Sequence, residues 1–151
     1  MLRQIRQWMM VIALGPTMLG GLGCGYLGIG EKGYTFPVEF SQDIPAAQGE
    51  VKVTPQKGGS QKVELVARHL PPPEAVAPQA RAYVVWLKPE GARTQNVGGL
   101  LVNEKREAKF TTTTSFNNFE ILVTSEKEAT ASEPGNARPI MRASVSGGRV
   151  Y

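Results

Sequence analysis

The sequence predicts an all-β fold. From about Gly49 onward, short segments alternate apolar and polar residues with a period of two, and turn residues separate them. No segment of the sequence sustains the 3.6-residue periodicity of an amphipathic helix, so we expect little helix. Hydrophobic residues make up 41% and charged residues 20% of the 151-residue chain. These fractions are typical of a globular domain and exclude a fully disordered chain or one with several membrane spans.

Seven segments carry this alternation and are predicted to be strands. They are 50–54, 62–68, 82–88, 96–103, 107–114, 119–124 and 140–145. The first ends at Pro55, and two glycines within 57–60 provide the turn into the second. The second ends before Pro71, Pro72 and Pro73, which lack the N–H that a β-ladder needs. We expect a rigid crossover at these prolines.

The third segment is almost continuously apolar, as expected of a central strand that is covered on both faces. A charged turn at 104–106 predicts that the fourth and fifth segments form a hairpin. A polar loop at 125–138 separates the sixth from the seventh. Seven strands with a large aromatic residue, Trp86, on the third are typical of an immunoglobulin-like antiparallel β-sandwich. We therefore predict that residues 49–151 form such a sandwich, with Trp86 in its core.

A different pattern opens the sequence. Residues 1–7 carry Arg3 and Arg6 and no acid, and residues 7–30 carry no charge. The apolar run within them spans about 15 residues, fewer than the ~20 that a membrane-spanning helix needs. A basic start, a short apolar run and small residues after it are typical of an export signal. We assign a signal peptide to residues 1–23.

Cys24, the only cysteine in the chain, follows this segment. Residues 22–25, Leu-Gly-Cys-Gly, resemble the lipobox of bacterial lipoproteins, in which the cysteine is acylated and becomes the mature N-terminus. The resemblance implies that Cys24 is lipidated and attaches the chain to membrane lipid. Gly21 stands where lipoboxes usually have leucine. Two alternatives therefore stay open, an uncleaved signal anchor within 7–30 and a free structural cysteine in a cytosolic protein.

Residues 24–48 are rich in glycine and proline and predict a flexible tether between the lipidated cysteine and the sandwich. Phe36, Val38 and Phe40 alternate with other residues, so the end of the tether could instead add a short edge strand. Without residues 1–23, 15 Lys and Arg remain against 13 Asp and Glu. Because they include no basic cluster that would follow a phosphate backbone, we expect no nucleic-acid binding.

The residue types that carry most enzyme chemistry are scarce. Asp43 is the only aspartate and His69 the only histidine. A single imidazole cannot make a three- or four-ligand metal site, so we expect His69 at the surface. Glu126, Glu128 and Glu133 fall in one loop, but a calcium site needs six to eight ordered oxygens, and a solvated loop is favoured. We expect no catalytic residue, no metal and no cofactor, and therefore not an enzyme.

Four short motifs follow one another between residues 63 and 147. A Leu-Pro-Pro sequence ends one strand, a strand from Tyr to Trp follows, a glycine precedes the next strand, and a Ser-Gly pair closes the last. The stretches that carry them are 63–73, 83–87, 98–102, 119–126 and 144–147, with the key residues Leu70, Pro71, Pro72, Tyr83, Trp86 and Gly98. In these stretches the sequence resembles the C-terminal extracytoplasmic domain of the anti-sigma-K factor family. The resemblance implies a β-domain outside the membrane, in which these six residues are structural.

Family members that regulate sigma factors carry a cytoplasmic anti-sigma domain before a membrane helix, whereas about seven residues precede the apolar segment here. The resemblance therefore implies the outer β-domain alone. We expect a membrane-anchored lipoprotein that presents a non-catalytic binding or structural module to a protein partner in the bacterial cell envelope, facing the periplasm or the exterior. The alternative is an accessory regulator or sensor in an anti-sigma-factor envelope-stress pathway.

A carbohydrate-binding accessory domain is a third hypothesis. Such a domain needs exposed aromatic platforms, and only Tyr26, Tyr34 and Tyr151 are predicted to be free, none of them within the strands of the predicted sandwich. We rank this hypothesis last.

Overall fold

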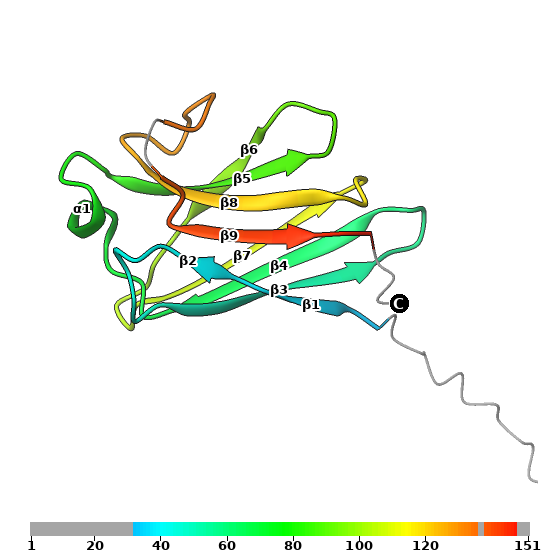
Figure 1. Ribbon diagram of the computed structural model, residues 1–151, viewed down its shortest axis with the longest axis horizontal. Helices are drawn as coiled ribbons and strands as arrows, with labels where there is room; N and C mark the ends of the chain where they lie inside the picture. The colour runs from blue at the N-terminus through cyan, green and yellow to red at the C-terminus, as the bar shows by residue number, and fades with distance from the viewer. Residues whose placement is uncertain (1–31, 136–137, 148–151) are drawn as a thin grey trace, which may run out of the picture.

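The computed structural model describes residues 32–135 and 138–147, which form a sandwich of two antiparallel sheets (Figure 1). The elements are β1 (Tyr34–Pro37), β2 (Glu39–Phe40), β3 (Gln48–Pro55), β4 (Gln61–Arg68), α1 (Pro73–Val76), β5 (Ala82–Pro89), β6 (Gln95–Leu100), β7 (Glu107–Thr114), β8 (Phe119–Glu126) and β9 (Met141–Val145). The first sheet has the order β1-β3-β4-β7, and the second has the order β2-β9-β8-β5-β6. The predicted all-β sandwich is confirmed.

Alternating residues build the first sheet as predicted. In β3 and β4, Val51 and Val53 lie opposite Leu65 and Val63, and all four side chains are buried between the sheets. The residues between them point outward to solvent, which is the pattern of a sheet with one wet face. Gly58 and Gly59 in the turn have φ values of 89° and 82°, a region that glycine adopts without strain.

Nine strands are present in the described residues instead of seven, because the sandwich begins before Gly49. β1 pairs with β3, and β2 pairs with β9, so the chain changes sheets at Val38. Ile44, in the following turn, is 3% exposed and belongs to the core. The predicted edge strand is therefore present, and the part of the predicted tether from Tyr34 to residue 48 belongs to the sandwich.

The predicted hairpin of the fourth and fifth segments is wrong. β6 pairs with β5 in the second sheet, whereas β7 pairs with β4 in the first. Residues 101–106 cross from one sheet to the other, and the two segments meet only at the bridge between Val102 and Ala108 and the adjacent hydrogen bonds between Asn103 and Glu107. Arg106 has a φ of 60°, which turns the chain at the start of β7.

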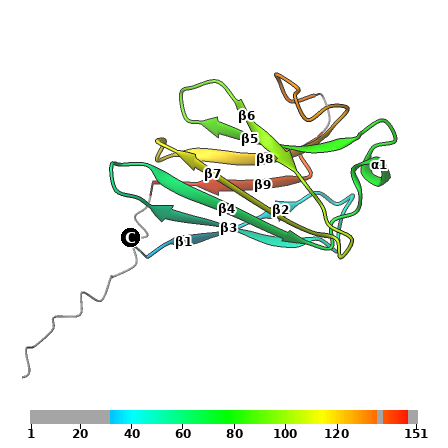
Figure 2. The same ribbon diagram turned by 180° about the vertical axis from the view of Figure 1, so that it is seen from behind.

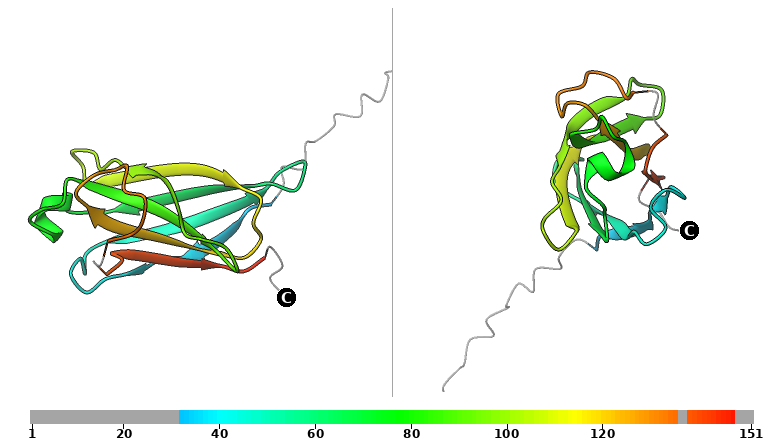
Figure 3. Two further views of the ribbon diagram at one scale, coloured as in Figure 1. Left: turned by 90° about the horizontal axis from the view of Figure 1, so that it is seen from above. Right: turned by 90° about the vertical axis from the view of Figure 1, so that its left-hand side faces the viewer.

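Trp86 is fully buried, but it does not lie in the core between the sheets. It packs with Val84 and Leu122 in a second cluster on the outer face of the second sheet, and Ala131 covers them. Residues 127–135, which we call the strap, cross this face and appear in orange in Figure 3. The prediction that β5 is covered on both faces is confirmed, and the position of Trp86 within the core is corrected.

The chain enters the sandwich at Tyr34, at the end opposite α1 (Figure 1). When the sandwich is viewed from the end that carries α1, this helix lies across the opening between the two sheets (Figure 3, right). Within the described part of the chain, no helix has the length and apolarity to cross a membrane.

Candidate functional site

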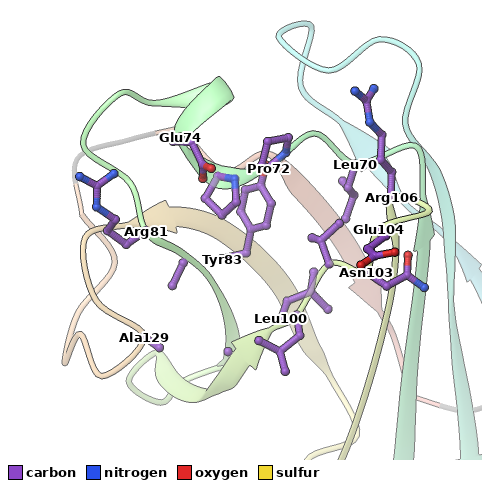
Figure 4. Close-up of a pocket in the computed structure, with 15 residues that line it drawn as sticks. Leu70, Pro72, Glu74, Arg81, Tyr83, Leu100, Asn103, Glu104, Arg106 and Ala129 are labelled. Carbon is purple, nitrogen blue, oxygen red and sulfur yellow. The ribbon is translucent and has the colours of Figure 1, made fainter.

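A cleft of about 500 Å³ lies at the end of the sandwich that carries α1 (Figure 4). Its apolar wall comes from three connected regions, the crossover after β4, the start of β5 and the end of β6. The wall includes Leu70, Pro72, Tyr83, Leu100 and Leu101. Leu101 is 85% exposed and is the one large hydrophobic side chain among the described residues that stands this far into solvent. A single exposed leucine is not unusual, but Leu101 continues the apolar wall of the cleft to the surface and is therefore a candidate contact residue.

The crossover after β4 builds one side of the cleft. His69 has a φ of 57°, which turns the chain out of the strand. Leu70 is then fully buried, and its N–H donates to the carbonyl oxygen of Arg106 at 3.1 Å. Pro72 and Pro73 begin α1, where the missing N–H of proline costs no helical hydrogen bond. The rigid crossover predicted at these prolines contains a single helical turn.

Tyr83 fixes the crossover to the second sheet. Its hydroxyl donates a hydrogen bond to the carbonyl oxygen of Pro71 at 2.9 Å. Burial, together with the smaller effect of the negative charge of Glu74, raises the pKa of Tyr83 to about 12. The phenol therefore stays protonated near neutral pH and acts as a fixed donor.

Charged residues surround the cleft in equal numbers of each sign. Glu74 and Glu104 lie on its rim with Arg81 and Arg106. Figure 4 shows the two arginines on opposite sides, with their guanidinium groups directed away from the centre. An apolar wall inside a rim of balanced charge suits an apolar side chain of a partner protein better than a strongly charged ligand.

Three of the six motif residues, Leu70, Pro72 and Tyr83, line this cleft, and a fourth, Pro71, accepts the hydrogen bond of Tyr83. Trp86 and Gly98 lie elsewhere. Gly98 has a φ of 140°, and a side chain there would meet the ring of Phe110 at 3.0 Å. A glycine is therefore needed at this position for both backbone and packing reasons.

Trp86 begins a chain of hydrogen bonds that holds the strap. Its indole N–H donates to Oγ1 of Thr124 at 2.8 Å, and the Thr124 hydroxyl donates to Oε1 of Glu126 at 2.6 Å. The same carboxylate oxygen accepts the N–H of Gly135 at 2.9 Å. From β6, the amide of Asn96 donates to the carbonyl oxygens of Ala129 and Ala131. Most residues of this loop are exposed, as expected, but these hydrogen bonds fix its backbone to the sheet.

The sequence also directed attention to residues that do not form a site. His69 is exposed, as predicted. Glu126 binds Thr124 and Gly135 rather than gathering with Glu128 and Glu133. Among residues 32–135 and 138–147, no three His, Cys, Asp or Glu side chains are close enough to hold a metal ion. Tyr34, predicted to lie outside the strands, is in β1 and is half-buried.

The lipidation prediction at Cys24 and the signal peptide at 1–23 lie outside the described residues. The sequence does not predict the cleft, because Leu101 is one more apolar residue within the predicted strand 96–103. The available signal was that the apolar run continues directly into the polar turn that begins at Asn103.

The sequence was compared with protein-family models and with curated proteins. No family model matches the chain, and no curated protein matches its sequence.

Proposed function

We propose that this protein is an exported lipoprotein, attached to the membrane through Cys24, that presents an immunoglobulin-like, non-catalytic β-sandwich to a protein partner in the bacterial cell envelope. The partner contacts the cleft beside α1. The signal-like residues 1–23 and the lipobox-like residues 22–25 support the attachment.

The observation that carries the proposal is the position of the cleft relative to the point of entry of the chain. Tyr34 and the cleft lie at opposite ends of the sandwich (Figure 1). β5, which runs between these ends from Ala82 to Pro89, is about 25 Å long at ~3.3 Å per residue. Ten peptide steps separate Cys24 from Tyr34, a reach of at most about 35 Å. An anchor at Cys24 therefore holds one end of the sandwich near the bilayer and leaves the cleft free to turn outward.

The chemistry of the cleft supports binding rather than catalysis. In this cleft the pKa of Tyr83 is raised to about 12, away from neutrality. A general acid or base works best with a pKa near the working pH. Tyr83 is instead committed to Pro71, and Leu101 offers a hydrophobic contact.

An accessory regulator in an anti-sigma-factor envelope-stress pathway is the second candidate. It is favoured by Leu70, Pro72 and Tyr83, which carry part of the family resemblance and line one wall of the cleft, with Pro71 bonded to Tyr83. A gene for a sigma factor or a zinc-containing anti-sigma factor beside this one would favour the regulator, and its absence would favour the structural module.

Intact-mass spectrometry of the protein extracted from membranes tests the attachment. We expect the loss of residues 1–23 and added acyl chains, and we expect the Cys24→Ala variant to keep its leader and gain no lipid. A native mass with the leader retained and no acyl chain would reject the lipoprotein.

A photo-crosslinking residue in place of Leu101 tests the cleft in living cells. The matched control places the same residue at Thr35, which is exposed on the outer face of β1. We expect a discrete cross-linked product from position 101 only. Equal products from both positions, or none, would count against the cleft as the contact site.

A further inference from the structure

The two sheets have four edge strands, and three of them are poor sites for another strand. β1 has four residues and ends in Pro37, and β2 has only two residues. β6 is interrupted at Gly98, whose φ of 140° departs from a regular strand and whose N–H donates to Oδ1 of Asn96 at 2.9 Å. Short edges, prolines and irregular backbone are the usual means by which proteins prevent edge-to-edge pairing.

β7 is different, because it is eight residues long and regular. Figure 2 shows it at the edge of its sheet, on the side turned toward the viewer. The N–H and C=O of Glu107 point away from β4, since they bond to Oδ1 and the N–H of Asn103 at 2.8 and 2.9 Å. Backbone groups alternate along a strand, so those of Thr111 and Thr113 also point away from β4.

The outward side of this strand is open beyond its first residues. Within the described residues, β7 pairs with β4 along its length, and its only other pairing is the bridge at Ala108. Thr111 and Thr113 are exposed. No charged residue occurs from 110 to 118, and threonine is a strong strand former. Beyond Lys109, this edge therefore lacks the lysines and prolines that normally discourage pairing.

We propose that β7 pairs antiparallel with β7 of a second copy of this chain, which joins the two first sheets into one continuous sheet. A two-fold axis at Thr112 sets Thr111 opposite Thr113 of the second copy, and both outward N–H groups then meet outward carbonyls. Lys109 falls opposite Ser115 of the second copy, so no like charges face each other. This self-complementarity is what favours a second copy over an unrelated strand.

The antiparallel arrangement sets the clefts of the two copies at opposite ends of the dimer. Each cleft lies beside α1, at the end opposite Tyr34, and the two-fold axis reverses one copy relative to the other. The Tyr34 ends are separated in the same way, so a dimer attached through both copies of Cys24 would lie lengthwise along the membrane, with one cleft at each end.

Sedimentation velocity of residues 25–151 from 1 to 500 µM tests the pairing. This segment contains every described strand and the whole described core. We expect a concentration-dependent dimer. Thr111→Pro removes one outward N–H per copy. It removes no bond to β4, because the N–H of Thr111 points away from β4, and proline is tolerated at such positions of an edge strand. The loss of two hydrogen bonds per dimer should weaken association about tenfold.

A second variant, Thr111→Lys with Thr113→Lys, keeps the backbone and opposes lysines across the axis, so it should also remove the dimer. The control, Thr35→Lys, lies on the outer face of the same sheet at the opposite edge and should leave the dimer unchanged. Circular dichroism verifies that each variant is folded.

Amide hydrogen exchange tests directly whether the outward amides of β7 become hydrogen-bonded when the dimer forms. Protection of the Thr111 and Thr113 amides should rise with protein concentration, whereas that of Val97 in β6 should not. A wild-type chain that stays monomeric to 500 µM overturns the proposal. It would be overturned in the same way if this edge binds a strand of another protein instead of a second copy. A dimer that survives both β7 variants overturns it as well.

Discussion

Replacing Thr124 with valine tests how the strap is held over Trp86. Trp86 is fully buried and Thr124 is 1% exposed, so the indole N–H has no water to replace its 2.8 Å bond to Oγ1 of Thr124. Valine has nearly the same shape but cannot accept a hydrogen bond. A buried donor without a partner costs about 1–3 kcal/mol, and the added methyl group returns less than 1 kcal/mol of that. We expect Thr124→Val to lower the free energy of unfolding by about 1–2 kcal/mol.

Urea unfolding followed by tryptophan emission measures this effect directly. Trp86 is the only tryptophan in residues 25–151, since Trp8 lies in the leader. Thr124→Ser is the matched control, because serine keeps the hydroxyl and should leave the emission of Trp86 closer to that of the wild type. A Thr124→Val variant as stable as the wild type would show that the indole N–H does not depend on this hydroxyl, and the reasoning would fail.

Three further predictions concern the cleft and the close packing near it. The raised pKa of Tyr83 means that the native state holds this proton more tightly than the unfolded chain does, so its contribution to stability is complete below pH 10. Between pH 10 and about 12 the free energy of unfolding should fall by about 2 kcal/mol more than in Tyr83→Phe, measured by urea titration at each pH. Gly98→Ala should cost about 1–3 kcal/mol, because the φ of 140° and the ring of Phe110 at 3.0 Å both oppose a Cβ. Gly91→Ala, with a φ of 73° and open space around it, should cost less in the same thermal melts, and an equal cost would mean that Phe110 contributes nothing. Leu101→Ser should change stability by less than about 0.5 kcal/mol, and a larger loss by calorimetry would show that Leu101 packs in the fold instead of serving the cleft.

The strands were predictable because each one alternates within its own few residues. Val51, Val53, Val63 and Leu65 point inward in the register that the alternation indicates. Which strands pair was less predictable, since pairing depends on distant residues. Neighbours in sequence usually pair, and this rule produced the false hairpin across 104–106. In the structure, β7 pairs with β4 instead.

The covering of Trp86 was predictable only in part. A continuous apolar strand indicates that both faces are buried, which is correct for β5. The strap that buries the outer face is polar in composition, so its sequence indicated a solvated loop. What holds it is a set of single contacts from Asn96 and Glu126, each of which depends on where the backbone carbonyls and amides of the strap lie. No local pattern encodes such contacts.

The change of sheet at Val38 has a mechanical consequence. β1 is bonded to β3 in one sheet and β2 to β9 in the other, so a pull on the chain ahead of Tyr34 is divided between both layers. The hydrogen bonds of an antiparallel ladder lie across the strands, and a lengthwise pull therefore strains several of them together in shear instead of peeling them apart one by one. If a partner holds the domain at the cleft while the N-terminal side is pulled, the force would load the hydrogen bonds of β1 and β2 in shear, the direction in which a β-ladder resists force best.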